Sequence, residues 1–311
     1  MTSKVTPEVD PQEVLPALPL DSWKDTLATV HMWSQIIGKV RLELCPLVNH
    51  WWNVAFYLTP RGMTTSAMPY GQGSVEIQFD FIDHKLVMEI SDGRVLAIPL
   101  KAESVAEFYL RFMAALADLG VAVKIWTRPV EIPDPIPFEK DQVHSAYDPE
   151  AMNKFWRILV WVDQVLKDFR TGFIGKSSPV HFFWGSFDLA VTRFSGRKAP
   201  ERPGADAITR EAYSHEVSSA GFWAGGGDIK GPAFYSYVWP EPAGFAERNV
   251  RPDKAFYDSN LKEFLLMYDD MRAAKSPKAA LMEFLQSTYD AAADLGKWDR
   301  KALERAVPTA A

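Results

Sequence analysis

The sequence contains a single cysteine, Cys45, among 311 residues. An intramolecular disulfide is therefore impossible, and nothing in the sequence points to an oxidising compartment. The chain also lacks the run of about 18 apolar residues that a membrane span needs, and its first residues lack the apolar stretch of a signal peptide. We therefore expect a protein of the cytoplasm with no membrane partner.

Positive charge is scarce as well. Lys and Arg number 34 against 40 Asp and Glu, which gives a net charge of −6, and no cluster of basic residues interrupts the chain. A protein that binds nucleic acid or an anionic membrane surface needs a basic field, so we expect neither partner. The six histidines never show the His-x-His or His-x-x-x-His spacing that places two imidazoles on one ion, so no metal site is predicted.

The motifs of common catalytic sites are missing. The glycine-rich stretch 223–232 lacks the Gly-Lys-Ser/Thr ending of a phosphate-binding loop, so it is interpreted as a flexible hairpin loop that could cover a site. Ser186 lies inside an expected strand, whereas a hydrolase nucleophile sits on a strand-to-helix turn. The sequence therefore identifies no reaction and no cofactor, and it does not predict the oligomeric state.

Aromatic residues are plentiful by contrast. The chain has 11 Trp and 19 Phe within a composition that is 47% hydrophobic and 24% charged. The overall balance is that of a globular protein, but these are more aromatic side chains than a core needs. Such an excess is typical of pockets and interfaces.

Hydrophobic periodicity predicts an α+β fold. Helices are expected over 22–39 with Asp21 as the N-cap, from Glu103 to a left-handed cap at Gly120, over 149–170, near 258–274 and near 277–296. Strands are expected over 51–58, 74–82, 85–91, 94–99, 121–126, 180–194, 211–223 and 233–239.

The two halves of the chain resemble each other. The first half contains Ile37-Gly38-Lys39, Pro46 and His50-Trp51-Trp52, and the second half contains the similar series Ile174-Gly175-Lys176, Pro179 and His181-Phe182-Phe183. Further along, the first half contains Glu107-Phe108 and Ala117-Asp118-Leu119-Gly120, and the second half contains Glu283-Phe284 and Ala293-Asp294-Leu295-Gly296. The order of the elements also agrees. We therefore predict a duplication that produced two tandem, internally similar helix/antiparallel-sheet/helix units.

Prolines mark the predicted boundaries. Residues 1–18 form a Pro-rich, acidic lead that we expect to be flexible, and residues 19–130 form the N-terminal unit. The Pro-rich connector, residues 131–147, cannot be helical where its prolines alternate and is the expected hinge. Residues 148–311 form the C-terminal unit, which carries the candidate site.

Several long stretches resemble one known family. They are W-S-Q-I-I-G-K-V-R-L (33–42), E-I-P-D-P-I-P-F (131–138), H-F-F-W-G-S-F-D-L-A-V-T-R-F-S-G-R (181–197), A-Y-S-H-E-V-S-S-A-G-F-W (212–223) and F-L-Q-S-T-Y-D-A-A-A-D-L (284–295). With them the chain resembles the domain-of-unknown-function family 5996 over most of its length. The resemblance implies a bacterial origin, but it implies no activity, substrate or catalytic residue.

The candidate site follows from two carboxylates in expected strands. Strand alternation places Asp188 with the hydroxyls of Ser186 and Thr192, and Glu216 lies between Ser214 and Ser218. A buried carboxylate needs hydrogen bonds, a cation or a raised pKa, as in acid–base sites. We therefore predict that both carboxylates project into one aromatic-lined cavity. The predicted catalytic residues are Asp188, Glu216, His215 and His181, and the predicted ligand-binding residues are Trp184, Ser186, Arg193, Tyr213, Trp223, Tyr235 and Tyr237.

Three hypotheses about function remain open. The first is a small-molecule-binding protein or enzyme that uses this pocket of the C-terminal unit. The second is a non-catalytic scaffold or interaction module in which exposed aromatics and the proline segment 132–137 meet a partner protein. The third is that the carboxylates only anchor loops. In the same structural interpretation, His50 and His181 are hydrogen-bonded histidines at strand starts. A closed aromatic cavity favours the first hypothesis, and a flat apolar patch favours the second.

Overall fold

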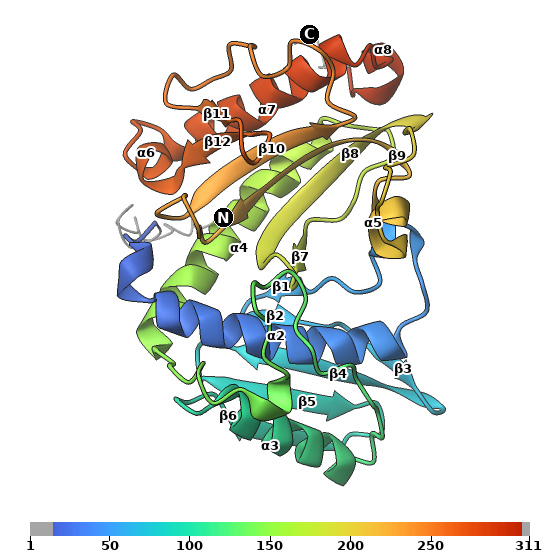
Figure 1. The fold of residues 1–311 in the computed structure, drawn as a ribbon, viewed down its shortest axis with the longest axis vertical. Helices are drawn as coiled ribbons and strands as arrows, with labels where there is room; N and C mark the ends of the chain where they lie inside the picture. Colours follow the sequence, from blue (N-terminus) through green and yellow to red (C-terminus); the bar gives the residue numbers. More distant parts are fainter. Residues whose placement is uncertain (1–14, 307–311) are drawn as a thin grey trace, which may run out of the picture.

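In the computed structural model, which describes residues 15–306, the chain has an α+β fold with two antiparallel sheets of six strands each (Figure 1). The helices are α2 (Lys24–Leu44), α3 (Val105–Asp118), α4 (Pro149–Thr171), α5 (Ala207–Ala212), α6 (Tyr268–Arg272), α7 (Pro277–Leu295) and α8 (Arg300–Leu303). Short 3-10 turns are η1 (Leu20–Ser22), η2 (Asn49–Trp51) and η3 (Phe138–Lys140).

The N-terminal sheet has the strand order β1-β2-β4-β5-β6, and β3 also pairs with β4. Its strands are β1 (Tyr57–Thr59), β2 (Gly62–Thr64), β3 (Met68–Tyr70), β4 (Gly73–Asp80), β5 (Lys85–Ile90) and β6 (Val95–Pro99). Alternation along β4 buries Val75, Ile77 and Phe79 on one face. Helix α2 is fixed to α3 by Trp33, whose ring stacks on Phe108 with 4.6 Å between ring centres.

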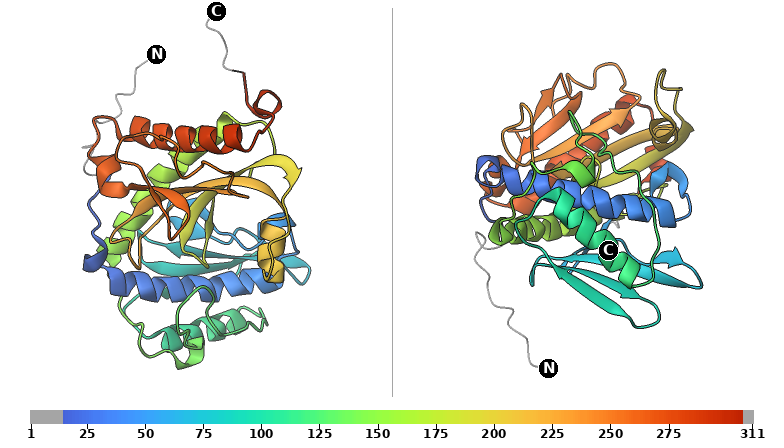
Figure 2. Two further views of the ribbon diagram at one scale, coloured as in Figure 1. Left: turned by 45° about the horizontal axis from the view of Figure 1, so that its top comes forward. Right: turned by 60° about the horizontal axis from the view of Figure 1, so that its bottom comes forward.

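The C-terminal sheet has the order β11-β12-β10-β9-β8-β7. Its strands are β7 (His181–Phe183), β8 (Asp188–Lys198), β9 (His215–Trp223), β10 (Ala233–Trp239), β11 (Phe256–Asp258) and β12 (Glu263–Met267). Helices α4 and α7 pack on one face of it (Figure 2), where Phe155 of α4 contacts Phe222 of β9. The other face is turned toward α2 and η2 of the N-terminal half.

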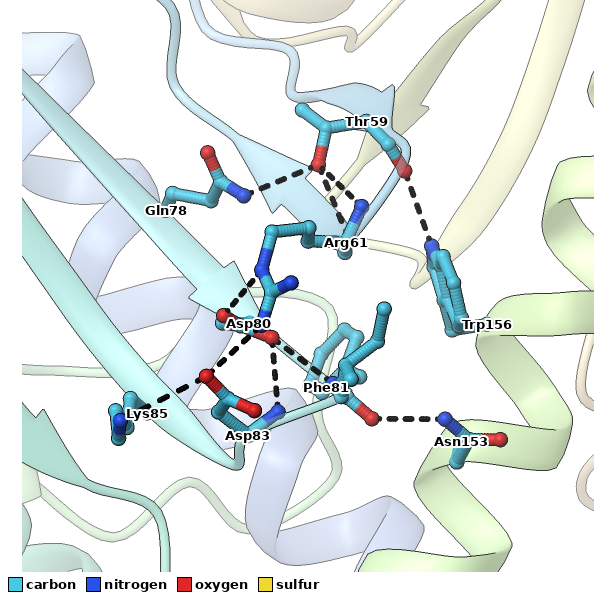
Figure 3. Close-up of polar contacts among 11 residues, drawn as sticks. Thr59, Arg61, Gln78, Asp80, Phe81, Asp83, Lys85, Asn153 and Trp156 are labelled. Carbon is cyan, nitrogen blue, oxygen red and sulfur yellow. Dashed lines mark hydrogen bonds and ion pairs between the residues drawn. The ribbon is translucent and has the colours of Figure 1, made fainter.

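The two halves share one hydrophobic core. Helix α4 contacts both halves, because two of its side chains donate hydrogen bonds to the N-terminal half (Figure 3). Trp156 donates to the Thr59 carbonyl at 3.2 Å, and Asn153 donates to the Phe81 carbonyl at 2.9 Å. The edges of the sheets also touch, since Phe56 and Phe182 exchange two backbone hydrogen bonds of 2.8 Å. The face of the C-terminal sheet that the helices leave open is thereby held opposite the N-terminal half.

Most predicted helices are confirmed. Helix α4 is capped by Asp148, and α3 begins with a capping box between Ser104 and Glu107 and is followed by Gly120 at φ 77°. The N-cap of α2 is Trp23, so the predicted cap by Asp21 is wrong, and that residue lies in η1. α2 also continues to Leu44, beyond the predicted end at residue 39.

Several predicted strands and one predicted helix are wrong. Residues 121–126 form no strand, 51–58 is strand only from Tyr57, and the strand predicted over 211–223 begins at His215, after α5. The stretch 258–274 is mainly β12 and α6, because pairing of Glu263–Met267 with β10 overrides the helix propensity of its Leu, Glu and Met residues.

The stretch 180–194 is two strands joined by a tight turn over 184–187, in which Phe187 has φ 58°. This turn breaks the single alternation that placed Trp184 and Ser186 in one row with Asp188. Strands β2 and β3 were not predicted, because each has only three residues.

The duplication and the domain boundaries stay predictions. Each half has a long helix before its sheet and another after it, but the matched histidines differ in setting, since His50 lies in η2 and His181 in β7. Residues 1–14 of the predicted lead lie outside the described residues. Leu15 and Leu18 are buried in the common core, so the end of that lead is packed.

Candidate functional site

A cavity of about 870 Å³ lies between the open face of the C-terminal sheet and the N-terminal half. The sheet side includes Asp188, Trp223, Tyr235 and Glu263, and the opposite side includes Lys39 of α2 and Glu131 of the connector. The site therefore needs residues from both halves.

Strand register explains which side chains reach the cavity. Asp188 of β8 lies opposite Trp223 of β9, and Ala190 lies opposite Gly221, which in turn lies opposite Tyr235 of β10. Every second residue of these strands points to the same face. The aromatic row of Tyr235 and Tyr237 predicted for β10 therefore does face the cavity.

Asp188 and Tyr235 form the polar centre of the cavity floor. They sit on β8 and β10, with β9 between them, and the Tyr235 hydroxyl donates a hydrogen bond to Oδ2 of Asp188 across Gly221. A Cβ atom at Gly221 would lie 2.2 Å from the Leu189 carbonyl oxygen and 2.5 Å from that hydroxyl, so glycine at this position leaves room for both. Burial raises the pKa of Asp188 to about 7, the Tyr235 hydrogen bond opposes the rise, and Glu131 adds to it.

Two further carboxylates lie near Asp188. Oε2 of Glu131 accepts a hydrogen bond of 2.7 Å from Ser186, and Glu263 projects from β12. Burial, together with repulsion by Asp188 and Asp258, raises the pKa of Glu263 to about 7. In the ion pairs of residues 15–306, none of the three cavity carboxylates has a Lys, Arg or His partner.

Helix α2 holds Glu131 in place. The side-chain amide of Gln35 donates to the Val130 carbonyl and accepts from the Val130 N–H, both at 2.8 Å. The next residue, Glu131, then adopts φ 56°, a left-handed conformation that side chains with a Cβ rarely take. This arrangement turns the carboxylate toward Ser186.

Lys39 follows Gln35 by one turn of α2 and is only 3% exposed. Its ammonium lies 4.6 Å from the ring centre of Trp126 and 6.0 Å from that of Trp184. Burial lowers the pKa of Lys39 to about 8, against a smaller opposite effect of Glu43. Within the described chain no carboxylate forms an ion pair with this ammonium.

Trp184 lines the cavity beside Lys39. Its indole lies against Gly38, where a Cβ atom would come within 2.3 Å of the ring, and its N–H donates a 2.9 Å hydrogen bond to the Val54 carbonyl. The absence of a side chain at Gly38 therefore sets how closely α2 approaches the C-terminal half.

His50 also lines the cavity, and Lys176 contacts it from outside the lining. Nδ1 of His50 donates to the carbonyls of Glu211 and Ala212 at 3.1 and 3.2 Å, and Nε2 accepts from Lys176 at 2.6 Å. Burial and the lysine charge lower the pKa of His50, which keeps the imidazole neutral. His215 lies next to it, with 5.7 Å between ring centres, and bonds to Ser214 outside the cavity lining.

The structure brings together seven predicted site residues around the cavity: Asp188, Trp184, Ser186, Tyr213, Trp223, Tyr235 and Tyr237. Glu216 is not among them. It precedes Trp223, the register partner of Asp188, by seven positions on β9 and points to the other face, where it pairs with Arg197 at 2.6 Å. At about 3.3 Å per residue the two carboxylates are roughly 20 Å apart, so the prediction of one shared cavity for both is wrong.

Arg193 and His181 also lie elsewhere. The guanidinium of Arg193 is on the helix-covered face, 3.5 Å from the ring centre of Phe169, so its predicted role as a ligand-binding residue is wrong. The ring of His181 is fully buried beside Phe183 and has no hydrogen-bond partner among the described residues. Burial lowers the pKa of His181 to about 3, which does not suit its predicted catalytic role.

Sequence reasoning missed the cavity residues from the N-terminal half and the connector: Lys39, His50, Trp126 and Glu131, together with Arg202 and Glu263. The one available signal was Lys39 itself, a lysine on the apolar stripe of an amphipathic helix between Ile36 and Val40. Among residues 15–306, no group of three or more His, Cys, Asp or Glu side chains is arranged to hold a metal ion.

Fold and site together define an α+β protein with an aromatic-lined cavity that contains carboxylates. A family model described as "Family of unknown function (DUF5996)" matches residues 15–305, and the chain belongs to that family. Neither a curated protein nor a solved structure matches the chain. Within the described part of the chain, no helix is long and apolar enough to cross a membrane.

Proposed function

We propose that this protein binds a small organic molecule in the cavity and that Asp188 is the central polar group of that site. The observation that carries the proposal is the cavity of about 870 Å³ with the Asp188–Tyr235 pair on its floor. Small-molecule sites in proteins measure about 300–1,000 Å³ and combine aromatic walls with a few convergent polar groups.

The same pair is suited to proton transfer. A carboxyl with a pKa of about 7 is present in both protonation states near neutral pH, so it can take up a proton from a bound molecule and return it. Tyr235 holds the carboxylate in one orientation. An enzyme that uses Asp188 as a general acid or base is therefore the catalytic form of the proposal.

The scaffold hypothesis draws on exposed apolar side chains. Trp126, Ile208 and Leu261 are 63%, 52% and 46% exposed, but all three also line the cavity. Because these side chains line the cavity, their exposure supports an apolar entrance to the site rather than a flat surface for a partner protein. The cytoplasmic location and the exclusion of nucleic acid remain part of the proposal, supported by the single cysteine and the net charge of −6.

A thermal-shift and NMR screen of a small-molecule library tests the proposal. We expect compounds that stabilise the wild type to lose about tenfold or more in affinity for Asp188→Asn, which keeps the shape but removes the ionisable group. Glu216→Gln is the matched control, because it changes a carboxylate of the same sheet on the opposite face. A screen in which no compound distinguishes wild type from Asp188→Asn contradicts the proposal.

A further inference from the structure

We infer that the ligand is a zwitterion, whose protonated amine lies among Asp188, Glu131 and Glu263 and whose anionic group meets Lys39. This inference rests on the proposed function and specifies the chemistry of the ligand.

On the acidic side of the cavity, no carboxylate forms an ion pair with a Lys, Arg or His among residues 15–306. Asp188, Glu131 and Glu263 line the same cavity, and Asp188 interacts electrostatically with both of the others. Among residues 15–306, the side-chain hydrogen bonds to these carboxylates come from two hydroxyls, Tyr235 to Asp188 and Ser186 to Glu131, and these donors carry no charge. Because like charges repel at short range, a bound cation would stabilise all three carboxylates together.

Lys39 is the independent observation that points to a second charge on the ligand. A lysine is rarely this buried unless its charge is paired, yet among the described residues no carboxylate forms an ion pair with this ammonium. It lies beside the indole rings of Trp126 and Trp184, and the charge of Glu43 acts on it without a direct ion pair. It lines the cavity, so a ligand can reach it. A carboxylate or phosphate group of the ligand would provide the missing partner.

The two charged regions lie close to each other. Gln35 holds Val130, the residue before Glu131, and Lys39 follows Gln35 by a single helical turn, which is about 5.4 Å. Trp184 contacts the Lys39 side, and the residues that follow it, Gly185 and Ser186, contact Glu131. One molecule with separated opposite charges can therefore satisfy both regions.

Aromatic side chains line the same cavity as the charged groups. Trp184, Trp223 and Tyr235 line the cavity, and the faces of such rings attract an ammonium group and pack against an apolar body. A ligand with an aromatic or apolar body is therefore favoured over a small hydrophilic zwitterion.

Isothermal titration with a matched set of indole compounds tests the inference. Tryptophan and glycyl-tryptophan carry both charges at two different separations, tryptamine carries only the amine, and indole-3-propionate carries only the carboxylate. We expect at least one zwitterion to bind the wild type about tenfold more tightly than either singly charged compound. At pH 6–7, where Asp188 and Glu263 of the free protein are mostly or half protonated, amine binding should also release protons to the buffer.

Variants assign each charge to its partner. Lys39→Met should make the zwitterion bind no better than tryptamine, and Asp188→Asn combined with Glu263→Gln should make it bind no better than indole-3-propionate. Lys24→Met, on an exposed part of the same helix, and Glu216→Gln are the controls and should leave all affinities unchanged. Thermal melts of each variant verify that it is folded.

Two results overturn the inference. One is that neither zwitterion binds more tightly than the singly charged compounds; the other is that the preference survives Lys39→Met. If the library screen still finds ligands that need Asp188, the cavity binds small molecules of a different charge and only this inference fails. If no ligand depends on Asp188, the proposed function fails with it.

Discussion

Replacing Asp188 with Asn should raise the melting temperature at pH 8 by about 6 °C. The folded pKa of Asp188 is raised from 3.8 to about 7 by burial, so the folded state favours the neutral acid. A rise of the folded pKa from 3.8 to about 7 corresponds to about 4 kcal/mol. For 311 residues the entropy of unfolding is about 0.65 kcal/mol/K, so 1 kcal/mol moves the melting temperature by roughly 1.5 °C. Asn cannot ionise and can still accept the Tyr235 hydrogen bond.

The sign of this effect depends on pH. Below about pH 4 the carboxyl is protonated in both folded and unfolded chains, so it causes no loss of stability. The loss grows between about pH 4 and pH 7 and is complete above the folded pKa. The neighbours that set this pKa are Tyr235, whose hydrogen bond lowers it, and Glu131, whose charge raises it. Melting curves of wild type and Asp188→Asn from pH 4 to pH 8 should therefore diverge as pH rises.

Two variants serve as references for this measurement. Tyr235→Phe removes the donor to the ionised carboxylate and should lower stability at pH 8. Glu216→Gln removes the charge of a partly buried carboxylate whose partner, Arg197, is half exposed, and it should lower stability by about 1 kcal/mol. If Asp188→Asn is instead less stable than wild type at pH 8, the carboxylate serves the fold and its role as a site is wrong.

Replacing Gly38 with Ala should destabilise the protein by about 1–3 kcal/mol, the usual cost of an overpacked core. In a free helix the same change would add roughly 1 kcal/mol of stability, because alanine has the higher helix propensity. The new Cβ atom would lie 2.3 Å from the Trp184 indole, so the ring must leave its place and lose its hydrogen bond to Val54. Urea denaturation measures the change.

A double-mutant cycle separates the contact from other causes. When Trp184→Ala has removed the ring, Gly38→Ala should become stabilising by about 1 kcal/mol, because only the helix propensity remains. Trp184→Ala alone is destabilising since it leaves a cavity. If Gly38→Ala is equally destabilising in both backgrounds, the indole is not the group that the new methyl meets.

The sequence predicted elements whose signal is local. The capping residues Asp148 and Ser104 and the apolar spacing of α4 mark helix ends independently of the rest of the chain. Strand β12 has no such signal: Glu263–Met267 consists largely of helix formers, and only pairing with β10 makes it a strand. The turn at 184–187 was missed for a related reason, because bulky aromatics on both sides suggested an unbroken strand.

The sequence predicted several residues of the candidate site on the C-terminal sheet but not those of the N-terminal half. Tyr235 and Tyr237 could be assigned to the cavity side because alternation along one strand fixes their face. Glu131 and Lys39 could not be added, because no sequence pattern shows that a helix and a connector of the first half face the second sheet. Glu216 was placed wrongly for the converse reason: sequence showed two carboxylates in rows of hydroxyls, but not that β9 turns Glu216 to the other face.

The connector is held by hydrogen bonds at both ends, which makes it a suitable place for an engineered insertion. Gln35 holds Val130 at one end, and at the other end the buried Phe138 donates a 2.9 Å backbone hydrogen bond to Thr127. The segment 132–137 between these anchors has no regular secondary structure. Proteins tolerate insertions best in surface segments of this kind. A fluorescent reporter inserted here would directly follow Glu131 of the cavity. Binding of a ligand in the cavity would then change the fluorescence of the reporter.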